Sequence, residues 1–213
     1  MGRNSKTALR ARIEEAFAPR TYPSDDGIGF VRPGCTGYEG NLVADFFRSK
    51  DWRDVTFRDI LDGYDAPIDA IPAFMLAEGL AYYLPAFLIM ALDLDSNATA
   101  ADNEASLLDG FVDSLCFMLT APSPDSLSEQ YDLLKDMSEV PEEVKERLRN
   151  PTPEAKAAEA AIVEKHSHLV ALLSDEQRQA VRETLEYIAD NFRQTDPNDE
   201  FNNAARALAS TWG

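Results

Sequence analysis

The sequence predicts an all-α fold: a single globular domain of several helices, spanning residues 1–213, around a buried central helix. The segment Ala73 to Leu94 contains fourteen consecutive uncharged residues, Gly79 to Leu92, in a chain of net charge −18. Its apolar residues fall on every face of a helix, which is typical of an element buried on all sides. Around it, apolar residues recur at helical spacing. The only β feature that the pattern allows is one short N-terminal strand or hairpin.

Pro85 interrupts this central segment. A proline inside a helix removes one hydrogen bond and clashes with the preceding turn. The segment is therefore either one kinked helix or two abutting helices, the second with Pro85 at its first position. Its fourteen uncharged residues would rise about 21 Å as a helix, short of the roughly 30 Å hydrocarbon core of a bilayer. We therefore expect a soluble protein.

The part of the chain before the central segment is predicted to form short helices separated by turns. The first helix is expected over Lys6 to Phe17, where Leu9 and Ile13 share a face with Phe17. Pro19 and the turn-rich residues after it end this helix. The elements expected next are a short strand at Ile28 to Arg32, helices at Tyr38 to Ser49 and Phe57 to Leu61, and a loop from Gly63 to Pro72.

After the central segment, Glu104 to Leu119 is expected to be an amphipathic helix. Its predicted apolar stripe is Leu107, Leu108, Phe111, Val112, Leu115 and Met118. The weaker pattern of Ser126 to Asn150 predicts two short helices around Pro141. A long Ala/Glu/Lys-rich helix of high intrinsic propensity is expected from Glu154 to about Leu173.

Two more helices are expected at the C-terminal end. Ser174 and Gln177 form a capping-box pattern. The helix that follows it carries Val181, Leu185, Ile188 and Phe192 at helical spacing. The last helix is expected at Asn198 to Trp212, with Phe201, Ala205 and Leu208 inward. The prolines near 122–124 and 151–153 are candidate boundaries, but neither flank has an independent core pattern. One domain is therefore expected, with residues 1–5 and 213 frayed.

The charge balance restricts the classes of partner. The chain has 38 Asp and Glu against 20 Lys and Arg, and such a surface repels nucleic-acid phosphates and anionic lipid. We therefore expect no nucleic-acid or membrane partner. A basic protein would be attracted to this surface, although an acidic surface can also serve solubility alone.

The acidic residues are concentrated in the middle of the chain. Asp93 to Glu146 contains fourteen acids and two lysines, whereas the first twenty residues are net positive. A docking surface for a basic partner would use such a region, because complementary charge speeds association and gives specificity. The alternative is a solvated acidic face. The residues that we expect to contact a partner are Asp109, Asp113, Asp125, Glu129 and Asp132.

Cysteine use and the N-terminus predict a cytoplasmic protein. Cys35 and Cys116 are far apart in the chain, and no secretory segment precedes them, so a disulfide framework is not indicated. Cys116 lies in an apolar run and is expected in the core.

Asp93 to Glu104 resembles a twelve-residue calcium loop. Acidic or amide residues occupy positions one, three and five, and Glu104 occupies position twelve. Ala98 stands at position six, where the sharp turn requires glycine. A weak calcium site and a plain acidic connector are therefore both open.

Signals of catalysis are sparse. The only two histidines, His166 and His168, are two residues apart and would not converge on one metal from a helix. Neither a nucleophile elbow nor a phosphate-binding loop is present, and no cofactor is expected. Glu78 is the only acid between Phe74 and Leu92. An enzyme of unrecognised type, with a pocket near Glu78, Tyr82 and Tyr83, is the alternative to a binding protein.

Two stretches resemble a known group. Tyr82 to Leu88, YYLPAFL, with a Trp52-Arg-Asp box before it, resembles an uncharacterised bacterial domain-of-unknown-function family marked by a YYLPAF box. Leu172 to Ile188 is similar to the closing motif of that family. The resemblance implies a bacterial protein and supplies no activity or site. By analogy of class, we expect an acidic protein-binding module, such as a toxin-neutralising (immunity-type) protein.

Overall fold

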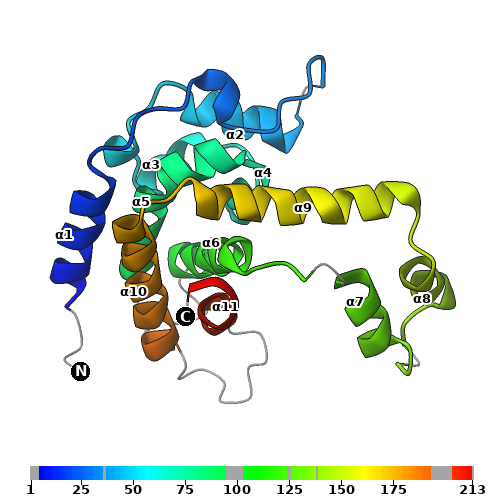
Figure 1. Cartoon of the computed structure of the whole chain (residues 1–213). Helices are drawn as coiled ribbons and strands as arrows, with labels where there is room; N and C mark the ends of the chain where they lie inside the picture. Colours follow the sequence, from blue (N-terminus) through cyan, green and yellow to red (C-terminus); the bar gives the residue numbers. More distant parts are fainter. Residues whose placement is uncertain are drawn as a thin grey trace.

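A computed structural model of the chain describes residues 5–35, 37–94, 103–123, 126–137, 139–192 and 203–212. These residues form an all-α structure with 11 α-helices and no strand (Figure 1). The α-helices are α1 (Lys6–Phe17), α2 (Glu39–Phe47), α3 (Phe57–Gly63), α4 (Ile71–Phe74), α5 (Ala77–Leu92), α6 (Asn103–Leu119), α7 (Ser126–Leu134), α8 (Glu142–Arg149), α9 (Pro153–Ala171), α10 (Asp175–Phe192) and α11 (Asn203–Ala207). Single turns of tighter or wider helix are η1 (Asp25–Gly27), η2 (Trp52–Asp54), η3 (Ile68–Ala70) and η4 (Leu208–Trp212). None of the helices in the described ranges is both long and apolar enough to cross a bilayer.

α5 is the central helix that the sequence predicts. All of its residues are buried except Glu78 and Ile89. It is one continuous helix with Pro85 inside it, so the alternative of a second helix starting at Pro85 is wrong. Packing on all sides holds the helix together at the turn where the proline removes a hydrogen bond.

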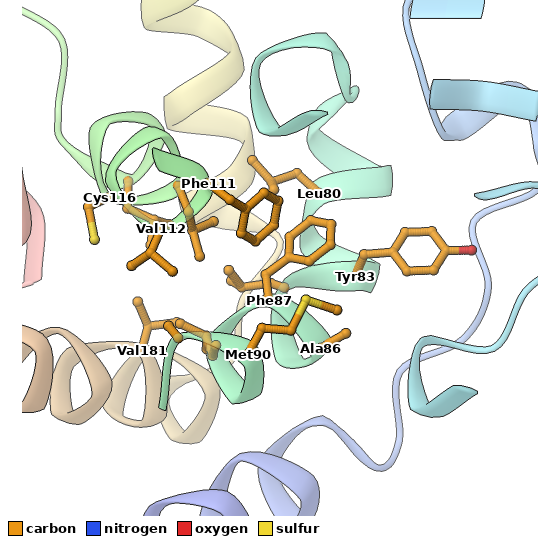
Figure 2. Packing of buried hydrophobic residues seen from close by; sticks show 14 of the residues in the cluster. Leu80, Tyr83, Ala86, Phe87, Met90, Phe111, Val112, Cys116 and Val181 are labelled. Carbon is orange, nitrogen blue, oxygen red and sulfur yellow. The ribbon is translucent and has the colours of Figure 1, made fainter. Parts of the chain in front are cut away.

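The core forms where other helices cover α5. Figure 2 shows Phe87 of α5 beside Phe111 of α6, and the two rings meet edge to face with 5.2 Å between centroids. Val181 approaches the same cluster from α10. α1 and α9 also pack on α5. One cluster of buried residues extends from Leu9 in α1 to Trp212 at the end of the described chain.

Tyr83 connects α5 to the segment after α2. Its hydroxyl donates to the carbonyl oxygens of Phe47 at 2.6 Å and Lys50 at 2.8 Å. Figure 2 shows this hydroxyl pointing away from the apolar cluster. Burial raises the pKa of Tyr83, which therefore stays protonated and holds this contact.

The strand expected at Ile28 to Arg32 does not form. Gly29 makes one isolated antiparallel bridge with Met75, flanked by hydrogen bonds from Phe30 N to Phe74 O and from Leu76 N to Ile28 O. The partner segment is only the short link between α4 and α5, so the ladder cannot extend.

Two further expectations need correction. The predicted loop from Gly63 to Pro72 contains η3 and the start of α4, because a proline is tolerated in the first turn of a helix. Leu107 is 39% exposed rather than part of the buried stripe. At the C-terminal end, the buried residues of α11 and η4 are Asn203, Ala204, Ala207 and Trp212. Leu208 is half-buried and packs against the core as expected, and Ala205 is half-buried. The wider helical turn of η4 changes the register there, and Phe201 lies outside the described residues.

Other expectations are confirmed. α1 has the predicted bounds, and two short helices flank Pro141. Ser174 and Gln177 exchange hydrogen bonds as a capping box at the start of α10. Cys116 is buried, and both cysteines are free.

Two helical glycines provide a matched test of the packing around α5. A Cβ at Gly79 would lie 2.3 Å from the carbonyl oxygen of Ile28, whereas a Cβ at Gly110 of α6 would meet nothing within 4 Å. We expect Gly79→Ala to lower the free energy of unfolding by about 2 kcal/mol. Gly110→Ala should raise it by about 0.5–1 kcal/mol, because alanine favours a helix more than glycine does.

Urea denaturation followed by helical circular dichroism measures both changes. If Gly79→Ala were as stabilising as Gly110→Ala, the close approach of α5 to the segment at Ile28 would be contradicted.

Candidate functional site

The acidic residues expected to contact a partner lie on two helices. Asp109 and Asp113 are exposed one turn apart on α6, and Asp132 is exposed on α7. Asp125 lies outside the described residues, as does the side chain of Glu129, whose backbone belongs to α7. The structure therefore brings Asp109 and Asp113 together and places Asp132 beyond the connection between the two helices.

Asp109 and Asp113 form an acidic pair, and no cation among the described residues makes an ion pair with either carboxylate. Burial and the neighbouring charge of Asp113 raise the pKa of Asp109. Asp113 accepts a hydrogen bond of 2.8 Å from the side-chain amide of Asn203 in α11. Phe117, one turn further along the same row of α6, is 56% exposed. This row of α6 thus combines negative charge with an exposed aromatic ring.

The chain from α7 to the first two-thirds of α9 extends away from the core, and we call this part, residues 126–164, the arm. Figure 1 shows α7 and α8 at the far end of α9, away from α1, α5 and α10. None of the described residues of the arm is buried, and in the whole of α9 the structure buries only Leu169. α7 packs against α8. Isolated helices shorter than about 12–15 residues are marginal in water, so the arm has little internal stabilisation.

Large apolar side chains are exposed along the arm. They are Leu133, Met137, Val144 and Ile162, with exposed fractions of 76%, 45%, 40% and 52%. Six of the eight large apolar side chains that are exposed among the described residues lie on the arm or on α6. Single exposed apolar residues are ordinary, but a concentration in one region is typical of an interaction surface.

Carboxylates accompany these apolar side chains. Asp132 pairs with Lys135 at 2.9 Å. The three cations of α8 each pair with an acid of the same helix. Among the described residues, no cation makes an ion pair with the exposed carboxylates of Glu139, Glu154 and Glu164, whereas the charge of Asp136 acts on the neighbouring Lys135. The arm therefore presents unneutralised negative charge beside exposed apolar surface.

Two adjacent residues of α9, Lys165 and His166, make polar contacts between the end of the arm and the body. The ammonium of Lys165 donates to the carbonyl oxygens of Ala73 at 2.9 Å and Pro72 at 3.2 Å, at the end of α4. A ring nitrogen of His166 lies 3.3 Å from the carbonyl oxygen of Leu119, at the end of α6. Desolvation lowers the pKa of Lys165 to about 8 and also lowers the pKa of His166. The attachment is thus partly polar and partly buried.

His166 and His168 point to different partners, as their spacing predicts. His168 lies 3.8 Å from the carboxylate of Glu78. The described residues contain no group of acidic, histidine or cysteine side chains that could hold a metal ion. Most of the candidate calcium loop, residues 95–102, lies outside the described residues; Glu104 at its end pairs with Arg58 at 3.5 Å.

Glu78 lies at a groove, but Tyr82 and Tyr83 do not. The groove has a volume of about 1180 Å³ and is lined by α1, the segment after it, Glu78 and the start of α10. Tyr82 and Tyr83 are buried at 4% and 0% exposure, and the ring of Tyr22 covers Tyr82 edge-on with 5.4 Å between centroids. The groove therefore contains Glu78 of the predicted pocket and neither of its two tyrosines.

The arginines of the groove already have structural partners. Arg20 donates to the carbonyl oxygen of Leu172 at 2.7 Å and to the side chain of Gln177 at 3.2 Å. Arg12 pairs with Glu183 of α10. These contacts connect α1 to the turn between α9 and α10. They explain why the N-terminal arginines lie here without any ligand being required.

Comparison with known proteins gives no relative: no family model matches the chain, and neither a curated protein nor a solved structure matches it significantly. The resemblance of the YYLPAFL stretch to a bacterial family stays a prediction.

Lys165 gives the attachment of the arm a pH dependence. Its pKa is about 8 in the folded protein and near 10.5 in the unfolded chain, so between these values the unfolded state binds more protons. The free energy of unfolding of the wild type should therefore rise, relative to that of Lys165→Met, as the pH increases from 8 to 10.5. Below pH 8 the two curves should run parallel.

Urea denaturation at each pH measures this difference. Lys156→Met, at an exposed lysine of the same helix, is the matched control. If Lys165→Met and Lys156→Met showed the same pH dependence of the free energy of unfolding relative to the wild type, burial of Lys165 would not be the cause of that dependence.

Proposed function

We propose that the protein is a protein-binding module, of the toxin-neutralising (immunity) type or another inhibitor class, that docks a basic partner protein through its arm and the adjoining face of α6. The observation that carries this proposal is the arm itself. It projects α7, α8 and the first two-thirds of α9, in which none of the described residues is buried, while Leu133 and Ile162 stay more than half exposed. A surface of this kind gains stability only when a partner covers it.

The charge of the surface favours a basic protein over other partners. Asp109, Asp113 and the unpaired carboxylates of the arm give the same sign of potential over α6 to α9. Such a potential repels phosphate backbones and anionic lipid headgroups, and it attracts lysine- and arginine-rich surfaces. Complementary charge would raise the association rate, and the exposed apolar side chains would slow dissociation.

Charge reversal tests the role of the acidic residues. A triple variant with Asp109→Lys, Asp132→Lys and Asp136→Lys should slow association with the captured cellular partner by about tenfold or more at low salt. The reason is that steering depends on the local potential. The cellular partner is first isolated from the source cells with the wild-type chain as bait. Biolayer interferometry then measures the association rate of this partner with the wild-type chain and with each variant.

The matched control changes the net charge equally at sites outside the arm. Asp26→Lys, Asp54→Lys and Asp65→Lys replace exposed acids near η1, η2 and α3. This control should retain most of the association rate. Equal slowing by both triple variants, or by neither, would contradict docking at the arm.

The groove beside Glu78 supports a second candidate function, the binding of a small ligand. It is concave, it is somewhat larger than the pockets that usually hold small ligands, and the Glu78 carboxylate at its edge lies 3.8 Å from His168. A thermal-shift screen of metabolites tests this candidate. A ligand whose stabilisation is lost in Glu78→Ala would support it, and the absence of any such ligand would count against it.

A further inference from the structure

We infer that the segment of the partner that the arm receives is an amphipathic helix with an apolar face flanked by lysine or arginine. This inference rests on the proposed docking function of the arm and specifies its occupant. It follows from the backbone available at the surface, from the placement of the exposed side chains, and from their charge.

The described backbone offers a helix surface and no sheet edge. The described residues contain no strand, and the one bridge between Gly29 and Met75 is isolated. A partner strand would need unpaired backbone groups at such an edge, whereas a helix packs on the ridges of other helices without them. The arm consists of three helices, so helix-on-helix packing is the mode that it can support.

Exposed apolar and acidic side chains stand next to one another at the end of α7 and just after it. Asp132 and Leu133 lie in the last turn of α7, which ends at Leu134, and Asp136 and Met137 follow in the turn after the helix. All four side chains are exposed. On α9, Ile162 is exposed, and the exposed Glu154 lies about two turns before it. Apolar and acidic side chains side by side match a partner helix whose leucine-like face is bordered by cations.

A second copy of the chain fits this surface less well. The chain carries a net charge of −18, and a twofold contact through the arm would place carboxylates of one copy against the same carboxylates of the other. Like charges opposed in an interface are costly. A basic helix instead neutralises Glu139 and Glu154, which make no ion pair with a cation of the described chain.

Three synthetic peptides of eighteen residues test the inference directly. The first is an amphipathic Leu/Lys helix, the second has the same composition in an order without an apolar face, and the third is a Leu/Glu helix. Fluorescence anisotropy measures their affinity for the full chain, and hydrogen exchange locates the contact. The Leu/Lys helix should bind most tightly and should slow exchange in α7, α8 and the start of α9.

Two single variants locate the site. Leu133→Ser removes the most exposed large apolar side chain of the described chain, and Val31→Ser is a matched control at another exposed side chain, 51% exposed and outside the arm. Leu133→Ser should weaken binding of the Leu/Lys helix by about tenfold or more, and Val31→Ser should leave it unchanged. Both side chains are exposed, so circular dichroism should show the same helix content for both variants.

The outcomes separate this inference from the docking function. If the second peptide, which has no apolar face, binds as tightly as the Leu/Lys helix, charge alone determines binding. If the Leu/Glu helix binds as tightly, the sign of the charge does not matter. Either result overturns the inference. If no peptide binds but Leu133→Ser still loses binding of the cellular partner, the partner segment is not a basic amphipathic helix. The proposed docking at the arm is then retained. If sedimentation shows a dimer of the wild-type chain that Leu133→Ser abolishes, the arm binds a second copy of the chain and the inferred basic helix is wrong. If Leu133→Ser retains the cellular partner, docking at the arm itself fails.

Discussion

The burial of α5 on all sides is the constraint on which the rest of the structure depends. A helix with only Glu78 and Ile89 outside the core must be surrounded, and α1, α6, α9 and α10 provide the cover. Close contacts make this cover specific: the backbone at Ile28 approaches α5 where only Gly79 leaves room, and the hydroxyl of Tyr83 satisfies two carbonyl groups beside η2. The arm adds no buried residue of the described chain to this cover.

Parts of this arrangement could be predicted from the sequence for physical reasons. An uncharged run can only be stable inside a core, so the position of α5 followed from composition alone. Capping chemistry is local, and Ser174 with Gln177 therefore indicated the start of α10 correctly. The prediction that Leu107 is buried is wrong because helical spacing shows which residues share a face of the helix, but not how much of that face is covered. The sequence did not predict that the ring of Tyr22 packs on Tyr82. Tyr22 lies in the turn-rich segment after Pro19, and only tertiary contacts determine the position of that segment.

The sequence located the acidic residues but did not indicate the shape of the region that carries them. The sequence indicated an acidic middle segment, and Asp109 and Asp113 do share one face of α6. It did not indicate that α9 leaves the core, because the Ala/Glu/Lys composition of this helix favours helix formation without marking a buried face. The weak apolar pattern before Pro141 was the available signal. Short helices with little apolar surface of their own require support from elsewhere, and the exposed Leu133 shows where that support is missing.

α5 holds the body together, whereas the arm buries none of its described residues and has little internal stabilisation. Native-state hydrogen exchange of the isolated chain measures this most directly, because it gives an opening free energy for each helix. The account predicts that amides of α5 exchange only through global unfolding, whereas those of α7, α8 and the start of α9 exchange through local opening at much lower free energy. Equal protection of α5 and the arm would show that the arm is stable without a partner and would contradict the account.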